Sequence, residues 1–296
     1  MTNKQKGIIF SLLATLIYGV TFTVAKDVMK TAVSSFAFVL MRVSGAMVIF
    51  WLLSFFLPAE KVDKQDYKKF FVAAMFGIAI NMMSFLTGLS YTSPISASVL
   101  MITTPIFVMI FSFMFLKNLI NRHKIIGVLI GLAGAVFLIV YGKKTSNFGS
   151  NPKLGNFLVA LNAVSYALYI ILAKPILSKY SPFTFAKWLY TFGFLLILPF
   201  TITQFMAIEW QNIELIIHLK IAFVVLFATV MTYLFNLIAL RELKPTTMSV
   251  FIYLQPLVAG IFAIFVGADI LTWIKIVSAG LIILGVYLVN VSTSKK

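Results

Sequence analysis

Polar side chains recur at helical spacing inside several long apolar stretches of this chain. Asn81 and Ser84 lie three residues apart in one stretch, and Asn162, Tyr166 and Tyr169 follow a similar spacing in another. Residues three or four positions apart share one face of a helix. Amides and hydroxyls on such a face can hydrogen-bond the polar head of a small molecule, and aromatic rings can hold its apolar body.

The candidate binding residues are drawn from most of the apolar stretches. They are Tyr18, Arg42, Asn81, Ser84, Thr104, Asn162, Tyr166, Tyr169, Tyr233, Asn236, Tyr253 and Gln255. The alternative is that these groups join neighbouring helices or bond their own backbone one turn earlier, as single Ser and Thr residues often do. A buried amide has four hydrogen-bonding sites to satisfy, so either role remains open for the Asn and Gln residues.

Arg42 is the one basic residue that lies well inside an apolar stretch, about two turns from its start. Its side chain can extend to the membrane interface, pair with Asp27, or bind an anionic ligand. Lys187 lies near the start of a stretch in the second half. If both cations point inward, they favour substrates that carry a carboxylate.

Several kinds of chemistry lack the residues they need. There is no cysteine, and all eight acidic residues lie at the ends of stretches or between them. His123 and His218 lie at the entrances of stretches, so no proton carrier inside the membrane is evident. No Walker motif and no clustered acid and histidine set is present, so we expect neither an enzyme nor a bound metal or cofactor.

Ten apolar runs of about 18 to 24 residues must position these side chains, since each is long enough to cross the hydrocarbon core of a bilayer. Hydrophobic residues make up 61% of the 296 residues and charged residues only 11%. The runs are continuous rather than alternating, which favours helices over barrel strands. We therefore predict an all-α polytopic membrane protein with ten transmembrane helices in the lipid bilayer.

The distribution of basic residues predicts the orientation. Segments on the side of the N-terminus hold 16 Lys and Arg residues, and segments on the other side hold 7. Positive charge accumulates on the cytoplasmic side, so both termini are expected to be cytoplasmic in the cell (inner) membrane. The net charge of +16 is scattered between apolar runs, and no nucleic-acid partner is expected.

The two halves of the chain resemble each other. Pro94 and Pro105 in the first half are matched by Pro245 and Pro256 in the second, and 245 − 94 = 256 − 105 = 151. Earlier positions match at a shift of 148, which pairs Tyr18 with Tyr166. Five helices in each half is an odd number, so the second copy must be inverted. We expect a first repeat over 1–144, a linker over 145–154 and a second repeat over 155–296.

Pro105 and Pro256 are expected inside the fourth and ninth helices. Proline removes a backbone hydrogen bond, so each can act as a hinge beside a cavity or form a static kink. Gly127, Gly131 and Ala135 form a face of small residues, which suits either a dimer seam or close packing inside one protomer. A monomer or a weak homodimer is therefore expected.

The quoted motifs resemble those of the EamA-like family of the drug/metabolite transporter superfamily. The resemblance rests on Y-G-V-T-F-T-V-A-K at 18–26, L-M-R at 40–42, S-A-S-V-L-M-I-T-T-P-I-F at 96–107, I-I-G-V-L-I-G-L-A-G at 125–134 and M-S-V-F-I-Y-L-Q-P-L at 248–257. It covers the whole chain. The family often has Gly-Glu after the fourth and ninth helices, whereas this chain has Lys117-Asn118 and Ala268-Asp269 there.

The resemblance implies a secondary transporter of small metabolites, often an exporter of amino acids or amphipathic compounds. Its central cavity would be lined mainly by helices one to four and six to nine. The inverted repeat favours alternating access at a site between the halves. A channel-like protein and a non-transporting receptor or scaffold are the alternatives, and the residues alone do not name the substrate.

Overall fold

The computed structural model describes residues 2–29, 33–92, 97, 100–117, 121–142, 151–255, 257, 258, 261 and 272–292. Across these ranges the chain is helical and contains no strand. In the first half the helices are α1 (Asn3–Met29), α2 (Ser35–Ser54), η1 (Lys64–Asp66), α3 (Tyr67–Ala74), η2 (Met75–Ala79), α4 (Ile80–Tyr91), α6 (Thr104–Leu116) and α7 (Arg122–Gly142). In the second half they are α8 (Pro152–Leu177), α9 (Pro182–Met206), η3 (Trp210–Asn212), α10 (Leu215–Phe223), η4 (Val224–Met231), α11 (Thr232–Glu242), α12 (Pro245–Ser249), η5 (Val250–Leu254) and α14 (Trp273–Ser292).

Five of the described helical segments are long and apolar enough to cross a membrane. They are Ser35–Ser54, Lys64–Tyr91, Pro152–Leu177, Pro182–Met206 and Leu215–Glu242. An all-helical membrane protein, as the sequence predicts, is thereby confirmed. The number of ten crossings remains a prediction, and most of the predicted linker, residues 145–150, lies outside the described residues.

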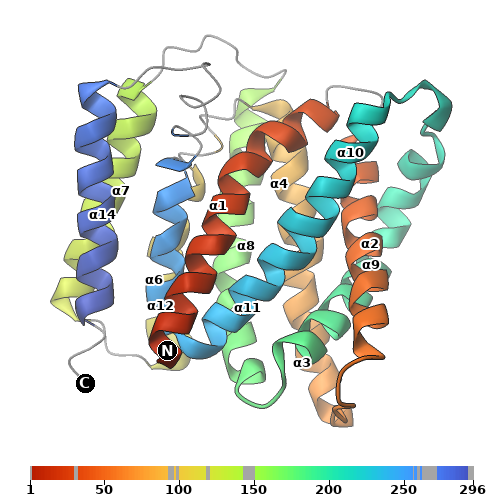
Figure 1. The fold of residues 1–296 in the computed structure, drawn as a ribbon, viewed down its shortest axis with the longest axis horizontal. Coiled ribbons are helices and arrows are strands. Elements are labelled where there is room, and N and C mark those ends of the chain that lie inside the picture. The colour runs from red at the N-terminus through yellow and green to blue at the C-terminus, as the bar shows by residue number, and fades with distance from the viewer. Residues whose placement is uncertain are drawn as a thin grey trace.

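Figure 1 shows how the helices are arranged along the bundle. Helices α7 and α14 lie side by side at one edge, and α2 and α9 pack together at the opposite edge. Between these edges α1 packs on α11 and α4 packs on α8. The largest buried apolar cluster joins α2, α3, α8, α9 and α11, so the packed core lies away from the α7–α14 edge.

Serine caps set the starts of the two helices at the α2–α9 edge. The hydroxyl oxygen of Ser34 accepts a hydrogen bond from the backbone N–H of Ala37, and that of Ser181 accepts one from Thr184, each at 3.2 Å. A side-chain oxygen at this position satisfies one of the free N–H groups of the first turn. Pro182, which has no N–H, occupies the first position of α9.

Two segments of equal length each contain a π-helical stretch. Lys64–Tyr91 and Leu215–Glu242 are both 28 residues long and begin 151 positions apart. The stretches are Met75–Ala79 in the first and Val224–Met231 in the second. In the second, the hydroxyls of Thr229 and Thr232 donate to carbonyls five residues earlier, at 2.9 and 2.7 Å. These bonds follow the wider π spacing.

The backbone is irregular before Pro105. Ile102 and Thr103 form a turn, and α6 begins at Thr104, so Pro105 lies in the first turn of a new helix. The expectation of a proline inside a continuous helix is therefore wrong for Pro105. A proline in a first turn is tolerated because its missing N–H has no partner there. At the matching place in the second half, Val250–Leu254 form a 3₁₀ helix, and Pro256 lies outside the described residues.

The face of small residues on α7 packs inside the protomer. A methyl group on Gly127 would lie 2.9 Å from the carbonyl oxygen of Gly285 in α14, and one on Gly131 would lie 2.5 Å from the ring of Tyr253. Ala135 is fully buried. Small residues let helix backbones approach closely. The alternative of a dimer seam formed by this face is therefore wrong.

Candidate functional site

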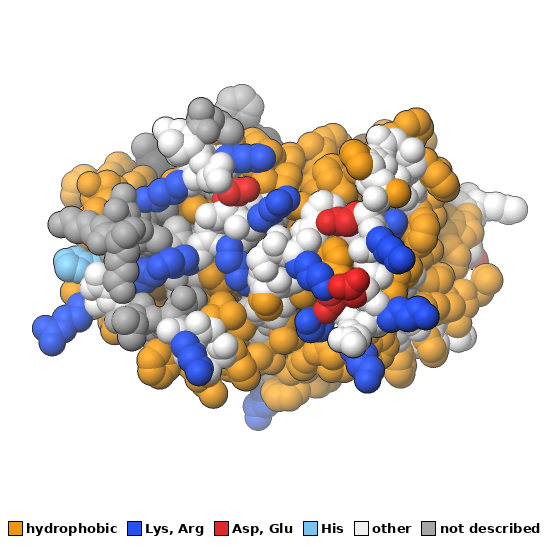
Figure 2. All heavy atoms as spheres, turned by 90° about the horizontal axis from the view of Figure 1, so that it is seen from below, with side chains coloured by type: hydrophobic (Ala, Val, Ile, Leu, Met, Phe, Trp, Pro, Cys, Tyr) orange, Lys and Arg blue, Asp and Glu red, His pale blue; other side chains and the backbone are white. Residues whose placement is uncertain are grey.

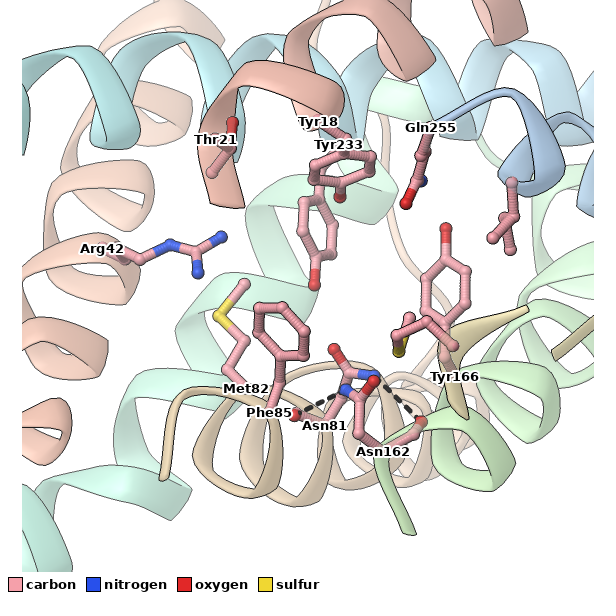
Figure 3. A pocket seen from close by; sticks show the side chains of 12 residues that line it. Tyr18, Thr21, Arg42, Asn81, Met82, Phe85, Asn162, Tyr166, Tyr233 and Gln255 are labelled. Carbon is pink, nitrogen blue, oxygen red and sulfur yellow. Dashed lines mark hydrogen bonds between the residues drawn. The ribbon is translucent and has the colours of Figure 1, made fainter. Parts of the chain in front are cut away.

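A cavity lies among the helices at the centre of the bundle. It is lined by residues of α1, α2, α4, α8, α11 and η5, and its empty space, part of it open to solvent, amounts to about 660 Å³. The lining residues are Tyr18, Thr21, Arg42, Asn81, Met82, Phe85, Met101, Asn162, Tyr166, Tyr233, Ile252 and Gln255. Figure 3 shows Arg42 at one side of this space, with the two asparagines and Tyr166 across from it.

Asn81 and Asn162 hold each other in place on one wall. The side-chain N–H of Asn162 donates to the backbone oxygen of Asn81 at 2.8 Å, and Asn81 donates to the backbone oxygen of Asn162 at 3.4 Å. Both side chains are buried. The reciprocal pair joins α4 to α8 and fixes which way each amide is turned (Figure 3). The Oδ1 atom of Asn162 is buried and has no hydrogen-bond partner among the described residues.

The π-helical stretch Met75–Ala79 supplies the next helices with free carbonyls. Ser165 donates to the backbone oxygen of Phe76 at 2.6 Å, and the Tyr233 hydroxyl donates to that of Gly77 at 3.1 Å. The ring of Tyr169 packs against Gly77, where a methyl group would lie 2.4 Å from its Cδ2 atom. The stretch therefore anchors α8 and α11 and fixes the hydroxyl of Tyr233 at the edge of the cavity.

Arg42 reaches the cavity from α2. Its side chain is 5% exposed, and its Nε–H donates to the hydroxyl of Thr229 in η4 at 2.9 Å. Arg42 and Asp27 form no ion pair with each other; the Asp27 carboxylate is instead paired with Lys220, whose Nζ atom lies 3.0 Å from Oδ2. Extension to the interface is likewise excluded by the burial of Arg42.

Lys187 does not share the cavity with Arg42. Its Nζ atom lies 4.7 Å from the ring centre of Trp51 and 5.8 Å from that of Trp188. Trp51 in turn donates its indole N–H to Thr191 at 2.9 Å. The contacts are cation–π contacts at the α2–α9 edge. The expectation that Lys187 adds a second inward-pointing charge is therefore wrong.

A second, smaller space continues from the first. It measures about 290 Å³ and shares Tyr18, Tyr166, Ile252 and Gln255 with the central cavity. Asn236 lines this second space rather than the first. Tyr18 and Tyr166, which match at the shift of 148, therefore line both spaces.

Eight of the twelve predicted binding residues line one or both spaces. They are Tyr18, Arg42, Asn81, Asn162, Tyr166, Tyr233, Asn236 and Gln255. The other four lie outside both linings. Ser84 donates to the backbone of Ile80 and Asn81, as the alternative interpretation allows. Thr104, Tyr169 and Tyr253 are buried behind the walls.

Five lining residues of the central cavity were not among the predicted ones. They are Thr21, Met82, Phe85, Met101 and Ile252. Four of them are apolar and look like any lipid-facing or core residue in an apolar stretch. Thr21 carries a usable signal, since it lies three residues after Tyr18 on the same helix face.

Charged side chains tie the α2–η1 loop to the end of α8. The Nζ atom of Lys179 contacts carboxylate oxygens of Asp63 and Asp66 at 2.5 Å each, and Tyr180 donates its hydroxyl to Asp66 at 2.8 Å. The hydrogen bonds with Asp63 and Asp66 raise the pKa of Lys179 above its usual range. The carboxylate of Glu60 accepts the backbone N–H of Ser181 at 3.0 Å.

The pKa of Glu60 is set by opposing effects. Burial tends to raise it, but hydrogen bonds with Thr184 and Ser181 outweigh burial and leave the pKa of this carboxyl below its usual range. The surrounding face of the molecule, which carries the start of α3, is rich in Lys and Arg side chains (Figure 2). Glu60, Asp63 and Asp66 are the acidic residues of this network.

Comparison with known proteins identifies the family. The sequence model of the EamA-like transporter family matches the chain twice, over residues 5–140 and 153–291. An "Uncharacterized transporter" of Archaeoglobus fulgidus is 27% identical over 293 residues, which is 96% of this chain and 98% of the relative. "Uncharacterized transporter YyaM" of Bacillus subtilis is 24% identical over 96% of this chain and 93% of its own length.

A solved structure has the same fold over its full length. It is titled "Crystal structure of protein", superposes with a TM-score of 0.78 at 14% identity, and the match covers 99% of this chain and 100% of that chain. Identity this low supports the fold alone. Together with the polar cavity inside an apolar helical bundle, the two family matches show that this chain belongs to the EamA-like transporter family.

Proposed function

We propose that this protein is a secondary transporter of small metabolites that works by alternating access at the central cavity. The carrying observation is the cavity itself, in which Arg42, Asn81 and Asn162 present polar atoms inside a bundle of apolar helices. Polar groups are costly in a membrane and are retained where they serve a pathway or a binding site. Membership of a transporter family favours this function over that of an enzyme.

The proposed architecture has ten transmembrane helices in two inverted repeats, over 1–144 and 155–296. The double family match supports it. So does the packing of α7 on α14, in which Gly134 approaches the carbonyl of Ser278 and Gly285 approaches that of Gly127. Gly134 and Gly285 are 151 positions apart, and so are Gly127 and Ser278, so each contact has its counterpart with the two helices exchanged. Such exchange of partners is expected of a pseudo-twofold axis between repeats.

We propose the inner membrane as the location, with both termini in the cytoplasm. The Lys- and Arg-rich face in Figure 2 would be the cytoplasmic one. We also propose that the turn before Pro105 is a hinge that bends when access to the cavity changes sides. Pro105 lies in the first turn of α6, close in sequence to the cavity residue Met101. Pro256 is the proposed counterpart.

Counterflow in proteoliposomes tests the proposal. Purified protein is reconstituted with a metabolite panel inside, and uptake of each labelled metabolite is followed. A carrier shows saturable uptake that the same metabolite accelerates from the opposite side. Non-saturable flux without counterflow would indicate a channel, and binding without flux would indicate a receptor.

A matched pair of variants assigns the activity to the cavity. Asn162→Leu changes a cavity residue, and Leu161→Ala changes its neighbour, which is 38% exposed to the surroundings of the bundle. We expect Asn162→Leu to slow counterflow at least roughly tenfold and Leu161→Ala to preserve it. Equal activity of the two variants would contradict the proposed site.

A further inference from the structure

Arg42 is a buried cation without a counter-charge. Its side chain is 5% exposed, and no carboxylate of the described residues lies within ion-pairing distance of it. The hydroxyl of Thr229 is the one hydrogen-bond partner that the guanidinium has among these residues. A guanidinium carries five N–H donors, so most of them are left over. A buried, unpaired charge is strongly destabilising unless something else neutralises it.

The free donors of Arg42 face the cavity. In Figure 3 the two terminal nitrogens of the guanidinium point into the space between Thr21 and Met82. The Nε–H donates to the Thr229 hydroxyl at 2.9 Å, which restrains the guanidinium. A fixed planar fork of N–H donors suits a carboxylate or a similar anion, which it can bind through two parallel hydrogen bonds.

The wall across from Arg42 carries an acceptor without a partner. Asn162 is 2% exposed, and its Oδ1 atom has no hydrogen-bond partner among the described residues. The amide cannot simply turn over, because its N–H is bonded to the backbone oxygen of Asn81 at 2.8 Å. Buried polar atoms are nearly always hydrogen-bonded, so this oxygen calls for an N–H or O–H donor from outside the protein.

Apolar side chains line the space between these two polar ends. Met82, Phe85, Met101 and Ile252 all border the cavity. A molecule that reaches from one end to the other would therefore place its carbon skeleton against thioethers, a phenyl ring and a branched aliphatic group. Such a lining discriminates weakly between apolar bodies of similar size, so the two polar ends set the selectivity.

We infer that the substrate is a small organic anion that also carries a hydrogen-bond donor, with the anion on Arg42 and the donor on Asn162 Oδ1. The inference rests on the proposed transport function and names its substrate class. An amine without an anionic group would meet the unneutralised charge of Arg42. An anion without a donor would leave Asn162 Oδ1 unpaired, so both kinds of analogue bind more weakly.

The test uses four probes with one apolar body. They are phenylalanine, 3-phenyllactate, 3-phenylpropionate and 2-phenylethylamine, measured by thermal shift of the purified protein and by competition in counterflow. A ligand that binds only the folded protein raises its melting temperature. We expect the first two to bind, 3-phenylpropionate to bind roughly tenfold or more weakly, and the amine not to bind. Comparison of the first two shows whether the donor is an ammonium or a hydroxyl group.

Two variants separate the two ends of the site. Arg42→Gln should weaken every carboxylate probe by roughly 10- to 100-fold, the range expected for a lost charged hydrogen bond. Asn162→Ala should bind 3-phenylpropionate as the unaltered protein does while losing its preference for phenylalanine or 3-phenyllactate. Arg42→Lys keeps the charge and should retain part of the carboxylate affinity.

The probe series on the unaltered protein does not depend on any variant folding. Stabilisation by the amine alone, no response to any carboxylate, or equal carboxylate affinity in Arg42→Gln would overturn the inference. Counterflow of cationic substrates alone would leave the transporter assignment standing and remove this substrate class. Absence of counterflow for every substrate tested with the unaltered protein would instead count against the transport function itself.

Discussion

Two helix pairs at the centre of the bundle share a frame but differ in their chemistry. One pair is α4 with α8, and the other is α1 with α11. A methyl group on Gly155 of α8 would lie 2.8 Å from the backbone nitrogen of Thr92, and one on Gly7 of α1 would lie 2.6 Å from Cγ of Leu243. Positions 7 and 155 differ by 148 and positions 92 and 243 by 151, the two shifts seen in the sequence.

The two pairs differ in the residues at the middle of their helices. Asn81 and Asn162 form their reciprocal hydrogen bonds between α4 and α8. The corresponding positions in the other pair hold Thr232 and Ala14. The Thr232 hydroxyl bonds its own helix at 2.7 Å, so it joins nothing across the pair. The comparison shows that repeated residues build the frame, whereas the hydrogen-bonded asparagine pair on the cavity wall breaks the repeat.

Substitution of the asparagine pair should give the largest effect. In Asn162→Leu, the backbone oxygen of Asn81 loses its donor and the cavity loses an acceptor, so we expect at least roughly tenfold slower counterflow and a destabilisation of about 1–3 kcal/mol. Unfolding in a denaturing detergent and counterflow measure the two effects. Thr232→Val is the control from the other pair and should change transport by less than about threefold, since it removes only a bond within one helix. A control as damaging as Asn162→Leu would show that the pairs are equally important.

Replacement of a glycine by alanine should destabilise the α4–α8 pair more than the α1–α11 pair, with a smaller effect than substitution of Asn162. In Gly88→Ala the added methyl lies 2.9 Å from the backbone oxygen of Gly155, so helices must move apart at a cost of about 1–3 kcal/mol. In Gly7→Ala the nearest atom is Cγ of the buried side chain of Leu243 at 2.6 Å, which must shift although it is not backbone. The higher helix propensity of alanine, worth about 1 kcal/mol, offsets part of this cost, so Gly7→Ala should destabilise less than Gly88→Ala. Equal destabilisation in detergent would contradict this difference.

Loss of an ion pair at the outer ends of these helix pairs should give a still smaller difference in melting temperature. Lys179 joins Asp63 and Asp66 at the end of α8, whereas Lys220 pairs with Asp27 at the end of α1. Lys179→Gln should lower the melting temperature more than Lys220→Gln, because it removes the cation shared by Asp63 and Asp66 and leaves Asp66 with only Lys69 and the Tyr180 hydroxyl. The raised pKa of Lys179 keeps it charged at neutral pH, and its contribution is lost only as the pH rises through that pKa. The gap between the variants should thus stay constant between pH 6 and pH 8, and a gap that closes there would refute this origin.

Acidification should give the smallest effect. The lowered pKa of Glu60 means that its carboxylate stabilises the folded protein above the usual glutamate pKa of about 4.3, and that this contribution fades as the pH falls below that value. Solvent screening limits it to no more than about 1 kcal/mol. The melting temperature of the protein should therefore fall slightly more between pH 6 and pH 4 than that of Glu60→Gln. Parallel curves would assign the acid sensitivity to other carboxylates.

The sequence predicted the helical membrane fold and most of the polar lining. Long apolar runs have one physical solution in lipid, and amides inside them stand out because their burial is costly. The sequence could not predict that Ser84 and Tyr169 lie outside the cavity lining, since both share helical spacing with lining residues. Only the exact rotation of each helix decides which of these side chains face the cavity. Lys187 was wrongly placed for a similar reason, because a lysine near a helix start can bend toward either the cavity or Trp51.

The wider turns at Met75–Ala79 and Val224–Met231 show where each helix accommodates an extra residue. Each π-helical stretch holds one more residue than an α-helix would need for the same turn. Deletion of a single residue there would restore α geometry and leave the following helix facing the same way, so Asn81 would still face Asn162. The same deletion in a regular α-helix would rotate everything after it by about 100°. The two segments thus share a local irregularity as well as their length and their 151-residue offset.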